Sequence, residues 1–346
     1  MELGLYSFGD SSVNPSTGRY ESEQVIYKNL LERIQLADQV GLSYFGLGEH
    51  HREDYPLSAP LALLAAAAAT TKNIRLGSAV TVLPTEDPVR VFEQYATLDV
   101  ISGGRAEITV GTGAFLESYP LFGHDTTLNQ LEFTEKLELV NLLNQQNPVT
   151  WSGQFRAPLV DAQIWPRPVN GKLDAWVATG ATPESSSRAA TLGMPAIYSF
   201  LGNPPADNVA LVEHYREQGT AAGFAPERLR VGLAGRGLIS IDGKTAKETL
   251  YRHWLPSVAK VSAERGRPAP DRKLFDEQAN GNGPILAGSP NEVADRIAAI
   301  WQALGHDRHI LHMDIGNVPH AQVMQSIELL GTLVLPQLAK PKLLAA

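Results

Sequence analysis

Short apolar runs alternate with helical patterns along most of this chain, and this alternation limits the possible folds more than any other feature. The runs that read as strands lie at residues 2–8, 42–47, 74–82, 106–110, 175–178, 195–200, 229–240 and 309–314. Helical spacing follows most of them, as Ile26, Leu30 and Ile34 illustrate after the first. Parallel strands joined by helical crossovers produce this order. The alternation predicts an α/β fold, a (β/α)8 TIM barrel with insertions, and an open doubly wound sheet is the alternative.

Two long segments interrupt the alternation. Residues 147–172 contain proline, glycine and tryptophan, and they predict a hairpin and a loop inserted before the fifth strand. Residues 265–284 are polar and rich in glycine, proline and asparagine, which predicts a functional or mobile loop. Because no linker composition divides the chain, we expect residues 1–346 to form a single domain.

Composition excludes several classes of function. The chain of 346 residues has a net charge of −8, which argues against nucleic acid as a partner. It has no cysteine, so disulfides, thiolate metal ligands and a cysteine nucleophile are excluded. The N-terminus lacks the basic start and apolar core of a signal peptide, and no apolar run is long enough for a membrane span. We expect a soluble, cytoplasmic protein with no membrane partner.

Polar residues follow the second predicted strand, where a barrel would place its active site. They are Glu49, His50 and His51. His50 is a candidate general acid or base, because the usual histidine pKa is about 6.5. The alternative is a strand end with two solvated histidines. A metal site is disfavoured, since neighbouring residues on a strand point to opposite faces.

A second group of histidines has the spacing of a metal site but not its geometry. His309 and His312 lie within the last predicted strand at an odd separation, so they should face opposite sides, with His306 just before them. A structural role is favoured, and no metal is expected. His312 and Asp314 end the strand and could still reach the barrel mouth.

A helix start follows the fifth predicted strand. Thr182 is a suitable N-cap, and the free amides that follow, with the Ser185 hydroxyl, could hold a phosphate. The alternative is an ordinary helix start without a ligand.

Residues 110–116 partly match the glycine pattern of a dinucleotide-binding site, but the third glycine and the following helix are missing, so a nicotinamide site is rejected. The small side chains of the alanine-rich helix expected at 59–70 suit packing within the fold. They would also permit close approach of two helices in a dimer.

Several of these segments together resemble the bacterial luciferase-like flavin-dependent monooxygenases. Their shared order and spacing carry the resemblance, and a (β/α)8 barrel is the fold that it implies. The matching segments are LSYFGLGEHH at 42–51, NIRLGSAVTVLPTEDPVR at 73–90, LDVISGGRAEITVGTG at 98–113 and ATGATPESSSRAATLGMP at 178–195, with weaker agreement at His253, Trp254 and 288–297.

The resemblance implies a bound flavin mononucleotide (FMN), or in some relatives the deazaflavin F420. His50 matches the catalytic histidine beside the flavin ring. Ala79 and Val80 match a non-proline cis peptide against which the ring packs, and residues 265–284 match a mobile loop that closes over the site. The residues that the resemblance assigns to cofactor binding are Ala79, Val80, Gly111, Thr112, Gly180, Thr182 and Ser185.

One departure from the family concerns the flavin phosphate. Bacterial luciferase has Cys-Arg where this chain has Gly111 and Thr112, and that arginine pairs with the phosphate. A threonine donates a hydrogen bond but brings no charge. Amides, hydroxyls or another cation, such as Arg156 or Arg188, would have to replace it. For the same reason light emission is not expected.

The resemblance implies a two-component monooxygenase. A separate flavin reductase would supply reduced FMN, O2 would form a C4a-hydroperoxyflavin, and a small organic substrate would be oxidised among Tyr6, Phe8 and Phe200. A homodimer is also implied. The alternatives are an F420-dependent hydride-transfer enzyme and a non-catalytic flavin-binding barrel. A metal hydrolase is disfavoured, because His50 and His51 do not form an HxH pair.

Overall fold

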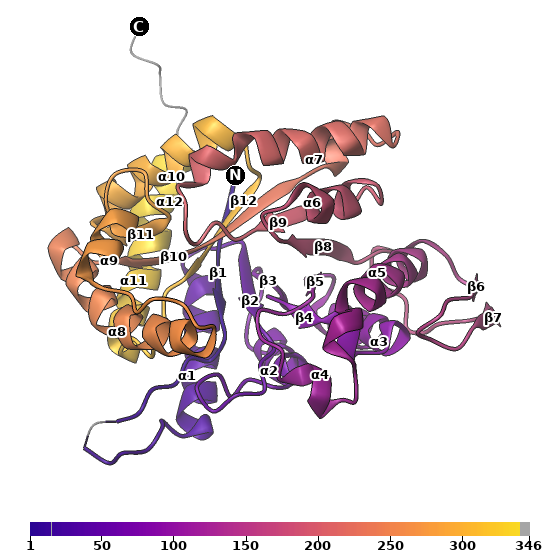
Figure 1. Ribbon diagram of the computed structural model, residues 1–346, viewed down its shortest axis with the longest axis horizontal. Helices are drawn as coiled ribbons and strands as arrows, with labels where there is room; N and C mark the ends of the chain where they lie inside the picture. The colour runs from indigo at the N-terminus through magenta and orange to yellow at the C-terminus, as the bar shows by residue number, and fades with distance from the viewer. Residues whose placement is uncertain (15, 340–346) are drawn as a thin grey trace, which may run out of the picture.

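A closed parallel barrel forms the centre of the computed structural model, which describes residues 1–14 and 16–339 (Figure 1). The first and last barrel strands lie side by side, and β10 pairs with both β9 and β12, which closes the ring. The (β/α)8 barrel is therefore confirmed and the open sheet is wrong. The barrel strands, in their order around the ring, are β12 (Arg308–His312), β1 (Glu2–Ser7), β2 (Tyr44–Leu47), β3 (Arg75–Ser78), β5 (Ala106–Gly111), β8 (Asp174–Thr179), β9 (Ala196–Tyr198) and β10 (Val231–Ile239).

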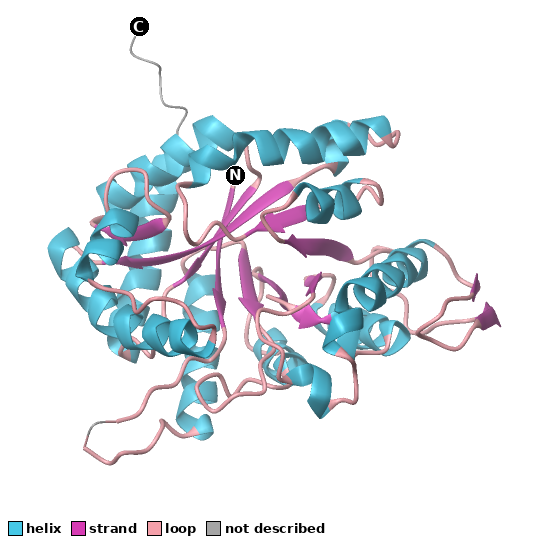
Figure 2. Cartoon of the chain, in the orientation of Figure 1, coloured by secondary structure: helices cyan, strands magenta, loops and turns pink. Residues whose placement is uncertain are grey.

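Helices surround the strands on the outside, as Figure 2 shows. Polar side chains fix several helix starts: Ser22, Asp87 and Asp242 each accept a hydrogen bond from a first-turn amide. Ser289 and Glu292 form a reciprocal capping box. The helices are α1 (Glu23–Gln39), α2 (Pro60–Ala68), α3 (Pro88–Ser102), α4 (Ser118–Leu121), α5 (Asn129–Gln145), α6 (Pro183–Ala190), α7 (Val209–Ala221), α8 (Gly243–Glu264), α9 (Arg272–Ala279), α10 (Pro290–Leu304), α11 (His320–Leu329) and α12 (Leu335–Ala339).

The first interruption has the predicted structure. β6 (Val149–Trp151) and β7 (Leu159–Ala162) form an antiparallel hairpin before β8, the fifth barrel strand. The predicted strand at 74–82 is divided into β3 and the short β4 (Thr81–Val82), which pairs with β5. The peptide bond between Ala79 and Val80 lies at this division and is cis.

The second interruption differs from the prediction. Residues 265–284 are not a loop throughout, because α9 occupies their centre and β11 (Ile285–Gly288) follows directly. Asp271 caps the helix, and Phe275 is fully buried with its ring 5.2 Å and 5.3 Å from those of Tyr251 and Trp254 on α8. Only Phe275 and Ala279 of this helix are buried, so the polar composition of the segment concealed it.

A buried ion pair joins opposite walls of the barrel near the amino-terminal ends of the strands, which we call the lower part of the barrel. Arg308 on β12 donates to Glu107 on β5 through two hydrogen bonds of 2.6 Å and 3.0 Å. These strands are four positions apart around the ring in either direction. The guanidinium lies between two aromatic rings, 4.6 Å from the centre of Tyr44 and 4.4 Å from that of Trp176. These residues form a floor across the barrel.

The strand period of two residues places smaller side chains above this floor. On β5 the next inward positions are Thr109 and Gly111, and on β12 they are Ile310 and His312. Because these side chains do not fill the ring, a cavity opens above the floor toward the carboxyl ends of the strands.

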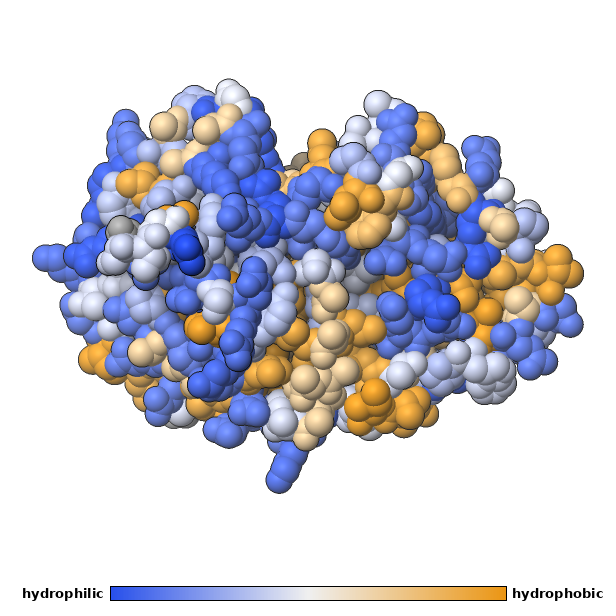
Figure 3. Space-filling model, turned by 90° about the horizontal axis from the view of Figure 1, so that it is seen from below, coloured by the Kyte–Doolittle hydropathy of each residue, from blue (hydrophilic) through white to orange (hydrophobic). Residues whose placement is uncertain are grey.

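The predicted homodimer would need exposed hydrophobic side chains that a partner could cover. Seen from below, they lie in separate groups, most of them in the right half of Figure 3. Leu121, Phe122 and Leu131 on and near α4 and α5 belong to the exposed set. The homodimer stays a prediction.

Within the described ranges, no helix is both long and apolar enough to cross a membrane.

The floor yields a prediction about stability. Arg308→Met leaves Glu107 buried without its main partner, and we expect the free energy of unfolding to fall by about 3–5 kcal/mol. Urea unfolding followed by tryptophan fluorescence measures this change. The control is Arg272→Met, which removes exposed ion pairs to Glu248 and Asp276 and should cost at most about 1 kcal/mol. Equal losses in the two variants would contradict the structural role of the floor.

Candidate active site

A cavity of about 390 Å³ lies at the carboxyl ends of the barrel strands. This volume lies in the range of small-molecule and cofactor sites. It is lined by most of the residues that the sequence assigned to cofactor, substrate or catalysis. They are Tyr6, Phe8, His50, Ala79, Val80, Gly111, Thr112 and Gly180.

Phe200 does not line the cavity. Its ring stacks on Tyr198 with the centres 5.4 Å apart, inside the hydrophobic core. Ile197, Ser199 and Leu201 line the cavity instead. Side chains alternate along an extended strand, so the substrate-pocket prediction for Phe200 chose the wrong face.

Thr182 and Ser185 lie at the start of α6, beside the cavity rather than in its lining. The Thr182 side chain caps the helix by accepting from the Ser185 amide at 3.3 Å. The Ser185 hydroxyl donates to the backbone oxygens of Gly180 and Thr182 at 2.7 Å and 2.9 Å. The structure therefore joins this helix start to Gly180, which does line the cavity.

The two arginines considered as replacements for the missing phosphate-binding cation lie elsewhere. Arg156 donates to the Asp87 carboxylate at 2.8 Å and to the Ala157 carbonyl. The Arg188 guanidinium lies 5.4 Å from the centre of the Phe133 ring. Neither residue lines the cavity. Near the predicted phosphate site lie the backbone amides and hydroxyls around Gly180, and Arg265 is a cation that does line the cavity.

His50 lies in an aromatic environment. Its ring centre is 4.7 Å from that of Phe8, 5.2 Å from that of Tyr55 and 5.3 Å from that of Phe115. Burial, assisted by the charge of Arg52, lowers the pKa of His50 to about 3. The imidazole is therefore neutral near pH 7, unlike the partly charged imidazole that the usual histidine pKa suggested.

His51 points away from His50, as the strand argument predicted. Its Nε2 lies 3.0 Å from a carboxylate oxygen of Glu49, and its ring packs against Phe122. The other carboxylate oxygen of Glu49 accepts the Val82 amide. Glu49 lines the cavity, but both of its oxygens are engaged.

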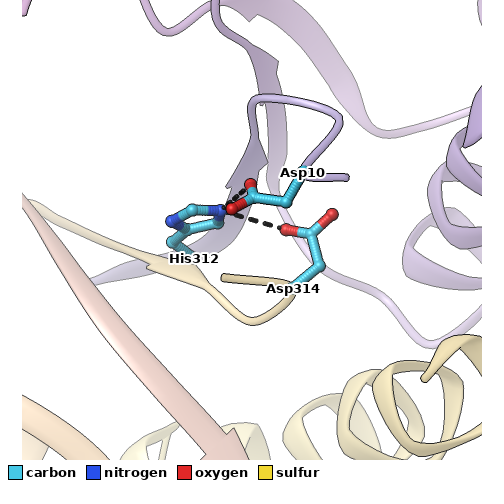
Figure 4. A group of neighbouring side chains, drawn as sticks. All are labelled: Asp10, His312 and Asp314. Atoms are coloured by element: carbon cyan, nitrogen blue, oxygen red, sulfur yellow. Dashed lines mark hydrogen bonds and ion pairs between the residues drawn. The ribbon is translucent and has the colours of Figure 1, made fainter. Parts of the chain in front are cut away.

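Three further residues beside the cavity were not identified as a group from the sequence. The His312 ring points between the carboxylates of Asp10 and Asp314, with Nε2 at 2.7 Å and 3.2 Å (Figure 4). Asp314 also accepts from Arg33 and from the Ser7 hydroxyl, and Asp10 accepts the backbone amide of Gly316. We call Asp10, His312, Asp314 and Arg33 the ionic cluster.

The ionic cluster has the ligand types of a metal site but is already satisfied internally. Burial lowers the pKa of His312, but the Asp10 and Asp314 carboxylates outweigh it and raise this pKa to about 9. Burial raises the pKa of Asp314, but Arg33 and His312 lower it to about 2. Burial raises the pKa of Asp10, and the His312 charge opposes this shift. With both carboxyl groups ionised, the ionic cluster pairs two carboxylates with an imidazolium and a guanidinium.

The other histidines near the last strand face away from the cavity. His309 Nδ1 lies 3.2 Å from His306 Nε2, and neither residue lines the cavity. His312 lines it from the opposite face of β12. The prediction that His309 and His312 point in opposite directions is confirmed.

The roof of the cavity comes from α8, which the sequence did not indicate. Ser257, Val258 and Val261 line the cavity, and the Ser257 hydroxyl lies 3.2 Å from the Tyr55 hydroxyl. Arg265 follows the helix at the mouth and donates to the Ala114 carbonyl at 2.6 Å. Strand ends and a helix thus enclose the space from below and above.

The cavity lies at the carboxyl ends of the barrel strands, which is where TIM-barrel enzymes have their active sites. This chain belongs to the luciferase-like monooxygenase family, whose model matches residues 1–308. One relative is the 4-hydroxyprotoasukamycin monooxygenase of Streptomyces nodosus subsp. asukaensis. It is 26% identical over 324 residues, which cover 89% of this chain and 85% of the relative. The predicted family and the prediction of an enzyme are confirmed.

Solved structures share the fold. Monooxygenase RslO1 from Streptomyces bottropensis has a TM-score of 0.82 at 24% identity, covering 98% of this chain and 100% of that one. The oxygenating constituent of 3,6-diketocamphane monooxygenase from Pseudomonas putida, solved with FMN, has a TM-score of 0.77 at 21% identity, covering 99% of both chains. An F420-dependent secondary alcohol dehydrogenase has a TM-score of 0.74 at 17% identity, covering 98% of this chain and 99% of that one.

The ionic cluster yields a prediction about pH. The pKa of folded His312 is raised above its unfolded value, so its stabilisation is complete below about pH 6.5 and disappears as the pH rises through about 9. We expect the stability difference between the native chain and His312→Gln to shrink by up to about 3 kcal/mol between pH 6 and pH 10. Urea unfolding at a series of pH values measures it. A difference that stays constant over this range would contradict the charge assigned to His312.

Proposed function

We propose that this chain is the oxygenase of a two-component flavin monooxygenase. Reduced FMN, supplied by a separate flavin reductase, and O2 act on a small organic substrate inside the cavity. Membership of the luciferase-like monooxygenases supports this proposal, as does the FMN complex of a structural neighbour described as an oxygenating constituent. A cytoplasmic location and a homodimer belong to the same proposal.

The shape of one cavity wall carries the proposal. Ala79, Gly111, Ala178 and Gly180 lie at neighbouring strand ends and leave a shallow, mostly apolar surface. A Cβ added to Gly111 would lie 3.1 Å from Val80 and 3.3 Å from Ala178, so the missing side chain keeps this surface open. The wall suits a flat tricyclic ring.

The anionic tail of the cofactor would lie beside this wall. Thr112 and Gly180 line the cavity at neighbouring strands, and α6 starts just beyond Gly180 with Thr182 and Ser185. Helix N-termini favour phosphates through their free amides and dipole. We assign these residues to the phosphate.

His50 and α8 define the proposed chemistry of the protein itself. Reduced flavin, when bound, would supply the carbon that activates O2, C4a. We propose a C4a-hydroperoxyflavin as the species that oxidises the substrate. Neutral His50 would accept or donate a hydrogen bond at the reacting oxygen, and the aromatic rings around it would exclude water. Val258 and Val261 on α8 would close the apolar roof over the substrate.

F420 remains the second candidate cofactor. It shares a tricyclic ring with flavin, and an F420-dependent alcohol dehydrogenase has the same fold. The reaction would then be hydride transfer without O2. The wall around Gly111 accommodates either ring, so the choice depends on binding and reactivity.

Cofactor titration tests the ring wall. We expect Gly111→Val to weaken binding of reduced FMN at least about 10-fold, because its methyl groups would occupy the ring surface. Anaerobic fluorescence titration with reduced FMN, and with reduced F420 in parallel, measures this. Gly202→Val is the matched control, since a Cβ there meets no atom within 4 Å. Absence of binding for both cofactors in the native chain would end the proposal.

Stopped-flow mixing of the reduced complex with O2 tests the role of His50. We expect His50→Ala to shorten the lifetime of the flavin–oxygen adduct and lower product yield, by about 10²-fold or more if His50 moves protons. Because the pKa of His50 is about 3, its loss should remove no inflection between pH 5 and pH 9. An unchanged adduct lifetime, or a native inflection near pH 6.5 that vanishes in the variant, would contradict this role.

A further inference from the structure

One charged side chain in the cavity wall has no partner. Arg236 on β10 lines the cavity, and among the described residues its guanidinium forms no hydrogen bond and no salt bridge. The buried guanidinium groups of Arg33 and Arg308, by contrast, both pair with carboxylates. Arg265, the other arginine of the lining, donates to a backbone carbonyl at the mouth. Arginine stays protonated in proteins, so Arg236 places an uncompensated positive charge in the wall.

The groups that face Arg236 do not neutralise it. Tyr6 and Tyr55 are nearby, but burial raises the pKa of both phenols, so they remain uncharged. Asp10 is the third group, and its two oxygens are occupied by His312 Nε2 at 2.7 Å and the Gly316 amide at 2.9 Å. Asp10 therefore acts on Arg236 only through its charge and forms no hydrogen bond or ion pair with the guanidinium.

An unpaired charge in a mostly apolar wall is costly for the folded protein. Arg236 is half-buried, with its guanidinium open to the cavity, and unpaired charges in such walls gather at functional sites. Arg236 therefore has the character of a ligand-binding group rather than a structural one. The ligand that balances it must bring a negative charge into the cavity.

The position of Arg236 separates it from the proposed ring wall. β10 lies four strands from β3 in either direction around the barrel, so Arg236 faces Ala79 across the cavity. It is in register with His312 on the neighbouring strand β12. The helix start assigned to the phosphate follows β8, two strands away. The anion opposite the ring wall would thus belong to the substrate rather than to the cofactor.

The surroundings of Arg236 describe the remainder of that ligand. Ile197, Ile310 and Ile315 line the same cavity, together with Val258 and Val261 of the roof. A planar guanidinium binds a carboxylate through two parallel hydrogen bonds. An apolar body with a single carboxylate matches both features.

We propose that Arg236 binds the carboxylate of the substrate, and that this enzyme acts on apolar organic acids. The assignment rests on the proposed function for the position of the flavin ring. The charge itself, and its freedom to bind an anion, do not depend on that function.

Calorimetric titration of the protein without flavin tests the proposal, with 3-phenylpropanoate as the probe and 3-phenylpropanamide as its neutral analogue. We expect the acid to bind at least about 10-fold more tightly than the amide. Arg236→Met should weaken acid binding by about 10- to 100-fold and leave amide binding unchanged. Arg236→Lys should be intermediate. Arg272→Met changes an exposed arginine of α9 outside the cavity lining; it is the matched control and should bind like the native chain.

Two further measurements separate the alternatives. The thermal midpoint of Arg236→Met should be equal to or higher than that of the native chain, because an unpaired charge is removed; a clear fall would mean that the guanidinium supports the fold. Arg236→Met should retain the native affinity for reduced FMN. Loss of FMN affinity with unchanged acid binding would assign Arg236 to the cofactor phosphate and overturn the proposal, as would equal binding of acid and amide by the native chain. If the native chain bound no flavin but discriminated acid from amide through Arg236, only the proposed function would fail.

Discussion

The ion pair between Arg308 and Glu107 is the constraint on which the rest of this structure depends. Neither charge tolerates removal of the other, since each would be left buried without a full partner. The pair joins β12 to β5 across the barrel and is enclosed by the rings of Tyr44 and Trp176. It therefore fixes opposite walls at a set separation. It also closes the amino-terminal end of the barrel interior, so the cavity at the carboxyl ends of the described barrel strands lies above it.

The same strands that carry the floor also carry the site, and the strand period links the two. Two residues above Arg308 lies Ile310, and two further on lies His312, whose imidazolium faces the cavity. Placing that charge in the barrel interior requires the carboxylates of Asp10 and Asp314. The charges of the site are thus held by the loops that follow the first and last barrel strands, which lie side by side.

The features predicted correctly from the sequence are those with local causes. The eight barrel strands, the hairpin within 147–172 and the inward position of His50 follow from periodicity and strand-end chemistry. The ionic cluster joins residues about three hundred positions apart, as Asp10 and His312 are, so no local pattern reveals it. Phe200 was misplaced because a strand one residue out of phase reverses every side chain. Helix α9 was missed because its two buried residues, Phe275 and Ala279, give only a weak periodic signal within a polar segment.

The two sides of the cavity differ in the charged groups that they present. This difference would orient a substrate relative to a bound cofactor. Burial keeps His50 neutral among aromatic rings, next to the small strand ends around Gly111. The small side chains of that wall leave room for a flat ring, and the aromatic rings around His50 favour the exclusion of water. The opposite side holds the guanidinium of Arg236 beside the ionic cluster. An apolar acid entering the cavity would be oriented with its carboxylate toward β10 and its apolar body toward the ring wall. Orientation of this kind brings reacting atoms together without any further contact from the protein.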